Sequence, residues 1–208
     1  PQANALINRL GFNNGGVERF VANVRASGYR GILGCNIGKN ADTPLERAVD
    51  DYVACLETLH AVADYVAVNV SSPNTVGLRD LQDAERLAPI LAALLECRAR
   101  LEKRGSRHVP LLVKLSPDLS DSALTACTTL IQGSGIDGVI ATNSTVSRQY
   151  VSGMPRAAEA GGLSGAPLRH LSLHVVRQLL ERLGPKFPIR GVGGVHDAQT
   201  ATEMRVAG

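Results

Sequence analysis

Five short apolar segments recur along the chain, and longer amphipathic stretches separate them. The segments are Gly31–Asn36, Tyr65–Asn69, Pro110–Lys114, Gly138–Asn143 and Pro188–Gly193. Four of them are nearly continuous apolar runs, as expected of parallel strands that are buried on both faces. Arg190 interrupts the fifth segment, and the pattern gives no reason for it. The sequence predicts a parallel sheet of five strands.

Helical periodicity fills the gaps between these segments. The predicted helices cover residues 17–26, 44–62, 81–103, 120–133 and 168–183, with one more beginning after Asp197. Thr43-Pro44-Leu45-Glu46 has the pattern of a capping box with proline at the first helical position. Ser120 is a typical N-cap, and Gly105 and Gly184 are typical of helix C-termini. Repeated strand–helix units indicate a parallel sheet that is either closed as a barrel or open and doubly wound.

Polar residues at the strand ends favour the barrel. Four predicted strands end in, or run into, a side chain capable of chemistry, namely Asn36, Asn69, Lys114 and Asn143. In a barrel all strand C-termini surround one mouth, whereas an open sheet concentrates its site at one switch point. A complete (β/α)8 TIM barrel has eight strands. We therefore expect an α/β fold, an incomplete fragment of a TIM barrel from a longer protein, with two exposed sheet edges.

Composition narrows the classes of function. The 208 residues suffice for one domain with a sizeable core. Aromatic residues make up 3%, tryptophan is absent and the net charge is only +3, which disfavours a nucleic-acid reader built on stacking platforms. No run of about 18 apolar residues predicts a membrane span. The four cysteines and five histidines have no metal-like spacing, so we expect reduced thiols, ordinary histidines and no metal site.

The residues after the second and third predicted strands carry the first candidate chemistry. Asn69 and Asn74 flank Ser72, and each amide offers one acceptor and two donors that match the edges of a flat heterocycle. An ordinary Ser-Pro turn is the alternative interpretation. Lys114 ends an apolar strand, and a buried ammonium requires a partner. That partner is either a delocalised anion, such as a reduced flavin ring, or simply a carboxylate.

Two glycine-rich loops and one asparagine-rich segment are further candidates. The loop Gly191–Gly194 follows a strand and is predicted to open a helix, so its N–H groups could hold a phosphate. Barrels often bind phosphate at the loops after their seventh and eighth strands. A tight turn is the alternative for this loop and for Gly161–Gly165. Taken alone, the segment Asn8–Asn14 is more typical of a polar loop with a helix N-cap than of a binding site.

Taken together, these segments resemble the successive motifs of class 2 dihydroorotate dehydrogenase. Seven motifs follow the family's order and cover nearly the whole chain. They are Asn8-Arg-Leu-Gly-Phe-Asn-Asn, Asn36-Ile-Gly-Lys-Asn, Asn69-Val-Ser-Ser-Pro-Asn-Thr, Lys114-Leu-Ser-Pro, Thr142-Asn-Ser-Thr, Gly161-Gly-Leu-Ser-Gly and Gly191-Val-Gly-Gly. The resemblance implies that residues 1–208 form an FMN-binding catalytic barrel domain that oxidises dihydroorotate to orotate in pyrimidine (UMP) biosynthesis.

The resemblance also implies a role for each matched position. Ser72 is similar to the family's catalytic base, which takes the C5 proton while hydride leaves C6 for the flavin. Residues resembling substrate contacts are Asn8, Arg9, Leu10, Gly11, Phe12, Asn69, Asn74, Asn143 and Ser144. Residues resembling FMN contacts are Asn36, Asn69, Lys114, Thr142, Gly165 and Gly194. Serine needs activation to act as a base, and Thr75, a water chain or oriented dipoles are the candidates.

Serine rather than cysteine at position 72 indicates the quinone-reducing, membrane-associated class 2. That class implies dihydroorotate and quinone as partners, no nucleic acid, and a peripheral place on the cytoplasmic side of the inner membrane. A class 1-type enzyme that uses fumarate or NAD is one alternative, and an inactive fragment is another.

The chain also departs from the family pattern. We expect it to lack the first two barrel strands, the last strand and the N-terminal helices that contact quinone and membrane, so that this piece alone would be soluble. Ser144 stands where threonine is more usual, a change that keeps the hydroxyl group.

Overall fold

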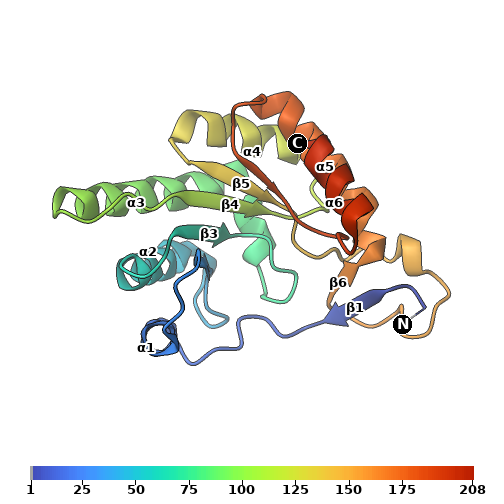
Figure 1. Ribbon diagram of the computed structural model, residues 1–208, viewed down its shortest axis with the longest axis horizontal. Coiled ribbons are helices and arrows are strands. Elements are labelled where there is room, and N and C mark those ends of the chain that lie inside the picture. Colours follow the sequence, from blue (N-terminus) through green and yellow to red (C-terminus); the bar gives the residue numbers. More distant parts are fainter. Residues whose placement is uncertain (1) are drawn as a thin grey trace.

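Five parallel strands form the central sheet of the computed structural model, which describes residues 2–208 (Figure 1). Each strand pairs with the next along the sheet. In spatial order they are β2 (Gly34–Ile37), β3 (Tyr65–Asn69), β4 (Leu111–Leu115), β5 (Gly138–Ala141) and β7 (Ile189–Gly191). All five predicted strands are confirmed, with ends shifted by up to three residues.

Within residues 2–208 six α-helices accompany the strands, and each of the first five packs on the helix that follows it in the chain. They are α1 (Val17–Ser27), α2 (Ala48–Leu59), α3 (Ala84–Lys103), α4 (Asp121–Ser134), α5 (Arg169–Leu183) and α6 (Ala198–Ala207). Short 3-10 turns occur at η1 (Leu45–Arg47), η2 (Leu78–Gln82), η3 (Gln149–Val151) and η4 (Ala166–Leu168). The described sheet is open at β2 and β7 and alternates with helices along the chain, as expected of an incomplete (β/α) barrel.

The helix ends follow the predicted signals with one exception. Ser120 caps α4 by accepting a hydrogen bond from Ala123 N, and Gly105 lies just past α3 with a φ of 88°. The capping box predicted at Thr43 is wrong, because Pro44 is extended and α2 begins only at Ala48, after a 3-10 turn. The Thr43 carbonyl instead accepts a hydrogen bond from the buried Lys39 ammonium (2.7 Å).

The two faces of the sheet differ in burial. Strands β3 and β5 are largely buried on both faces, as their apolar runs predict. Strand β4 alternates, with Leu111 and Val113 buried on one face and Lys114 half-buried on the other. The expectation of two buried faces is therefore wrong for β2 and β4 within residues 2–208. The fifth segment, which Arg190 interrupts, forms the partly exposed strand β7. Arg190 lies on the same face of the sheet as Lys114, which we call the open face. There its guanidinium group donates to the Tyr65 hydroxyl (2.9 Å) and lies 5.2 Å from the ring centre. These contacts account for an arginine in the fifth strand.

A second, two-stranded sheet was not predicted from the sequence. Strand β1 (Ala5–Asn8) pairs antiparallel with β6 (Gly162–Gly165), so that residues about 150 positions apart become neighbours. A bridge between Thr145 and Leu163 joins this sheet to the loop that follows β5. Figure 1 shows β1 and β6 beyond the arrowheads of the central strands. The small sheet therefore borders the carboxyl end of the barrel fragment.

None of the helices within residues 2–208 is long and apolar enough to cross a membrane.

Candidate active site

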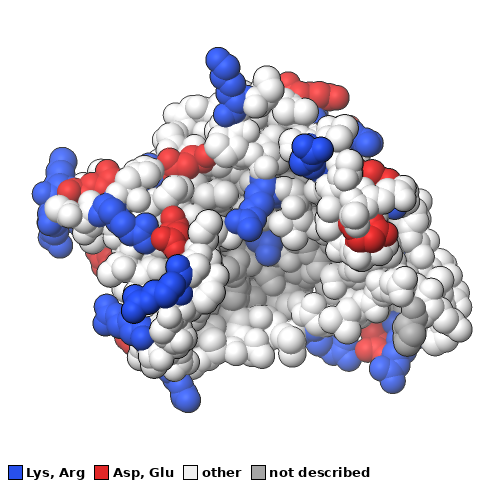
Figure 2. All heavy atoms as spheres, in the orientation of Figure 1, with Lys and Arg blue, Asp and Glu red and all other residues white. Residues whose placement is uncertain are grey.

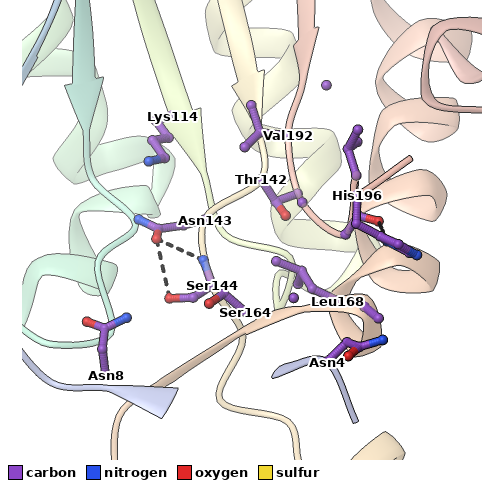
Figure 3. Close-up of a pocket in the computed structure, with 16 residues that line it drawn as sticks. Asn4, Asn8, Lys114, Thr142, Asn143, Ser144, Ser164, Leu168, Val192 and His196 are labelled. Atoms are coloured by element: carbon purple, nitrogen blue, oxygen red, sulfur yellow. Dashed lines mark hydrogen bonds between the residues drawn. The ribbon is translucent and has the colours of Figure 1, made fainter. Parts of the chain in front are cut away.

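A cavity of about 590 Å³ opens between the carboxyl ends of the central strands and the small sheet (Figure 3). This size is typical of small-molecule sites. Figure 2 shows the molecule hollowed near the centre of one face, with basic side chains above the hollow. The sequence-predicted residues that line the cavity are Asn8, Lys114, Thr142, Asn143, Ser144, Gly165 and Gly194. Seven of the fifteen predicted positions, from five separate segments, thus face one space.

Other predicted residues lie outside this lining. Asn36 faces a smaller hollow of about 200 Å³ on the open sheet face, and Lys114 forms a wall of both spaces. Gly11 and Phe12 line a third cavity, between α1 and β2. Arg9 is exposed and paired with Glu159, and Leu10 is also exposed. Of the stretch 8–12, only Asn8 faces the main cavity.

Asn69 and Asn143 are held together at the edge of the cavity. The Asn69 Oδ1 accepts hydrogen bonds from Ser71 N (3.1 Å), Ser71 Oγ (3.0 Å) and Asn143 Nδ2 (3.3 Å). The same Asn143 Nδ2 lies 3.1 Å from Ser71 Oγ, and Asn143 Oδ1 accepts from Ser144 N (2.8 Å). Behind them the buried Tyr52 hydroxyl donates to the Asn69 carbonyl (2.9 Å). Both ends of the Asn143 amide are therefore oriented by protein partners.

Ser72 follows Ser71 in the chain and, like Asn69 and Asn74, is not among the residues that line the cavity. The Asn74 Nδ2 donates to Asn8 Oδ1 (3.1 Å), which connects the loop after β3 to the small sheet. The Asn74 backbone N donates to Ser72 Oγ (3.3 Å), and Ser72 is 9% exposed. Among residues 2–208 no hydrogen bond joins Ser72 to Thr75. Of the candidates for activating Ser72, the dipole of the Asn74 backbone N–H is therefore the one in contact with its hydroxyl.

Lys114 projects from β4 toward the cavity (Figure 3). Burial lowers the pKa of its ammonium from the ordinary lysine value, and no charged neighbour in the part of the chain that the structure describes offsets that effect. The carboxylate partner considered from the sequence is therefore absent within residues 2–208. A half-buried ammonium without a counter-ion favours a negatively charged or electron-rich ligand.

Further polar groups around the cavity also lack protein partners. Thr142 Oγ1 is buried and forms no hydrogen bond with any described residue. The backbone N–H groups of Gly193, Gly194 and Val195 likewise donate to no atom within residues 2–208, and all three residues line the cavity. Consecutive free N–H groups in a loop form an anion-binding concavity. The donor set is therefore suited to an anionic group and a polar ring.

The predicted place of the phosphate-binding loop at the start of a helix is wrong. The loop 191–194 does not open the following helix, because α6 begins at Ala198. The N-terminus of α6 is already occupied by the Asp197 carboxylate, which accepts from Thr200 N (2.7 Å). The N–H and hydroxyl groups of Thr200 lower the pKa of this carboxyl group. Any anion bound here would thus be held by the loop itself.

Several lining residues were not predicted from the sequence. They include Asn4, Ser164, Leu168, Val192 and His196. Ser164 lies within the motif Gly161–Gly165, and His196 lies two residues after Gly194, so proximity to the motifs was a usable signal for both. Asn4 had no such signal, because only the unforeseen pairing of β1 with β6 brings it to the cavity.

The phosphate-side loop depends on glycine at position 194. A Cβ there would lie 2.5–2.6 Å from backbone and side-chain atoms of Arg169, and the φ of Gly194 is 73°. We expect Gly194→Ala to lower the free energy of unfolding by roughly 2–4 kcal/mol, from overpacking and a strained backbone. Gly133→Ala is the matched control, because a Cβ there meets nothing within 4 Å inside α4. The control should be neutral or stabilising by up to about 1 kcal/mol in the same denaturant titration.

Comparisons with known proteins place these features in context. The sequence matches the family model of dihydroorotate dehydrogenase over residues 1–208. It is 54% identical over 211 residues to the dihydroorotate dehydrogenase (quinone) of Bordetella avium strain 197N, covering 100% of this chain and 60% of that protein. It is 51% identical over 208 residues to the protein of the same name from Pseudomonas aeruginosa strain LESB58, covering 100% of this chain and 61% of that one.

A solved structure agrees with these relatives. The crystal structure of ligand-free DHODH from Eimeria tenella superposes with a TM-score of 0.89 at 32% identity. The superposition covers 100% of this chain and 62% of that one. The chain therefore spans about 60% of the length of the curated relatives it matches.

Proposed function

The chain belongs to the dihydroorotate dehydrogenase family, and from this we propose that the full-length protein oxidises dihydroorotate to orotate with bound FMN and passes the electrons to a quinone. In this proposal residues 1–208 are part of one FMN-binding catalytic barrel domain that serves pyrimidine (UMP) synthesis. One observation carries it: unpartnered donors and oriented amides from separate strand ends face a single cavity.

The free donors around the cavity fit FMN. Lys114 and Thr142 offer an ammonium and a hydroxyl to a polar ring, and the free N–H groups of residues 193–195 suit a phosphate. The proposed cofactor contacts are Asn36, Asn69, Lys114, Thr142, Gly165 and Gly194. When bound, FMN would accept the hydride that dihydroorotate loses at C6. The protein supplies position and electrostatics, and the Lys114 charge would stabilise electron density arriving on the ring.

The amide groups of the site suit the substrate ring. Dihydroorotate presents alternating C=O and N–H groups, which asparagine side chains match with one acceptor and two donors each. The proposed substrate contacts are Asn8, Arg9, Leu10, Gly11, Phe12, Asn69, Asn74, Asn143 and Ser144. The hydrogen bonds Asn74–Asn8 and Asn143–Asn69 support this assignment, because they fix the amide orientations before a ligand binds.

Ser72 is the proposed catalytic base, which removes the C5 proton as hydride leaves C6. A free serine hydroxyl is a poor base, so its surroundings must favour the alkoxide or carry the proton away. The hydrogen bond from Asn74 N to Ser72 Oγ supports activation, because an N–H donor stabilises developing negative charge on the oxygen.

The proposed acceptor is a quinone. The curated relatives from Bordetella avium and Pseudomonas aeruginosa carry "(quinone)" in their names, and Ser72 stands where class 1 enzymes use cysteine. A quinone acceptor places the full-length protein at the cytoplasmic side of the inner membrane as a peripheral protein, through a segment outside this chain.

An acceptor assay on the purified full-length protein tests the proposed function. Under anaerobic conditions dihydroorotate should bleach the flavin absorbance, and a quinone analogue should restore it. Fumarate and NAD should leave the flavin bleached. Reoxidation by fumarate or NAD instead would indicate a class 1-type enzyme. A flavin spectrum that does not respond to dihydroorotate would refute the dehydrogenase assignment itself.

A further inference from the structure

Arg79 lies in η2, at a point where the loops after β3, β4 and β5 come together. Its guanidinium group contacts all three loops. Arg79 Nε donates to the Ser71 carbonyl (3.4 Å) and Nη2 to the Ser144 carbonyl (3.1 Å). Nη1 forms an ion pair with Asp118 Oδ2 (2.9 Å). One planar group thus connects three segments that are separate in the sequence.

Asp118 extends the same connection. Its Oδ2 accepts a hydrogen bond from Val146 N (2.9 Å), and its Oδ1 accepts one from the Thr145 hydroxyl. The carboxylate therefore contacts the loop after β5 as well as Arg79. The side chains of Arg79 and Asp118 are 23% and 19% exposed, so solvent screens this pair less than a surface pair.

A buried scaffold fixes the pair from behind. Gln82 Oε1 accepts from Ser116 N (2.8 Å), and Gln82 Nε2 donates to the Arg79 carbonyl (3.3 Å). Ser116 Oγ in turn accepts from Asp118 N (3.1 Å). Gln82, Ser116 and Thr145 are all buried. The guanidinium fork and the carboxylate are consequently held in one orientation.

The atoms that Arg79 holds are next to the proposed reacting groups. Ser71 precedes Ser72 in the chain, and Ser144 follows Asn143. The Ser71 hydroxyl group also forms hydrogen bonds with the side-chain amides of Asn69 and Asn143. Neither Arg79 nor Asp118 lines the cavity. Any effect on the chemistry would therefore act through the position of these loops.

We propose that Arg79 and Asp118 form a positioning pair that sets the base Ser72 relative to the substrate contacts Asn143 and Ser144. This inference rests on the proposed function. A displacement of about 1 Å in a catalytic group can cost about 10²-fold in rate, so the loss of a three-way connection is expected to slow the chemical step. Lysine cannot replace the guanidinium fully, because it lacks the planar fork that reaches three acceptors.

Arg98 and Asp137 provide a matched control. They form another partly buried ion pair, with side chains 11% and 27% exposed. Arg98 belongs to α3, and Asp137 accepts a hydrogen bond from Leu111 N at the start of β4. This pair lies at the amino-terminal end of the strands, away from the cavity. Its loss would cost stability without moving the loops of the site.

The experiment uses stopped-flow absorbance on full-length FMN-loaded protein, measuring flavin reduction by dihydroorotate and reoxidation by a quinone analogue separately. Arg79→Ala is expected to slow flavin reduction about 10²-fold. Arg79→Lys and the milder Asp118→Asn should slow it less. In all three variants reoxidation should stay within about twofold of wild type. Arg98→Ala should leave both rates within about twofold despite a lower melting temperature. Melting curves and flavin content identify the folded fraction of each variant.

Two results would overturn the proposal separately from the proposed function. Reduction at the wild-type rate in folded Arg79→Lys and Asp118→Asn would show that the pair positions nothing. Equal slowing of reduction and reoxidation, or equal slowing in Arg98→Ala, would show a general structural role. If dihydroorotate does not bleach the wild-type flavin, the proposed function is refuted, and the positioning role that rests on it is refuted as well.

Discussion

Ser72→Ala in the full-length protein is expected to retain FMN and to lose about 10²–10⁴-fold in the rate of flavin reduction by dihydroorotate at neutral pH, the contribution typical of a positioned base. Ser72 Oγ is held by the Asn74 N–H, and the residue does not line the main cavity with the free donors that suit the cofactor. The substitution therefore removes the proton acceptor and leaves those donors in place. Stopped-flow absorbance measures the effect directly.

Ser72→Cys is the matched control for this experiment. A thiol restores a group that can take a proton, and the thiolate forms at lower pH than an alkoxide. We expect Ser72→Cys to reduce flavin faster than Ser72→Ala, with a rate that rises with pH as the thiolate forms. Near-normal flavin reduction by Ser72→Ala would show that the base is another group.

Lys114→Met is expected to have the second large effect, a loss of about 10²–10³-fold in flavin reduction, as for the removal of one group that stabilises developing charge. The half-buried ammonium has no charged partner within residues 2–208, so its charge is available to the ligand. Methionine keeps much of the volume but removes the charge. Weaker retention of FMN during purification should accompany the slower reduction.

The lowered pKa of Lys114 also predicts two pH effects. Because the ammonium loses its proton at lower pH than an ordinary lysine, flavin reduction should decline at alkaline pH below the ordinary lysine value. The unfolded chain holds this proton more tightly than the folded one. At a pH below the Lys114 pKa of both the folded and the unfolded chain, the folded protein bears the full free-energy cost of the buried charge. The free energy of unfolding of the flavin-free protein therefore rises with pH only between these two pKa values. Lys114→Met should abolish that rise.

Arg190→Met serves as the control for Lys114→Met. Arg190 is a cation on the same open sheet face, but it is already engaged with the hydroxyl and ring of Tyr65. Its loss should leave flavin reduction within about twofold. If Lys114→Met reduces flavin as fast as Arg190→Met does, the charge at position 114 has no role in the chemistry.

The central sheet was predictable because its signals are local. Apolar runs such as Tyr65–Asn69 identify strands directly, and glycine or serine at the ends of helices identifies their limits. The site followed from the same logic, since residues such as Lys114 and Asn143 close buried strands whose C-termini must lie together. The resemblance to a known family then added roles that periodicity alone could not provide.

Long-range contacts account for what the sequence did not reveal. Strand β1 and the glycine-rich β6 pair with each other across more than 150 residues of sequence, outside the central sheet that the apolar runs predicted. The Arg79–Asp118 pair likewise joins residues whose proximity depends on the assembled strand ends. The capping box predicted at Thr43 is absent because the Thr43 carbonyl accepts from the buried Lys39 ammonium and Pro44 is extended.

The most direct test of the account is a structure of the full-length protein with FMN and orotate bound. We expect the flavin ring to lie in the cavity against Lys114 and Thr142, with its phosphate at residues 193–195. We also expect Ser72 Oγ near C5 of orotate, at about 3–3.5 Å. A flavin bound elsewhere, or a Ser72 Oγ remote from C5 of the bound orotate, would contradict this prediction.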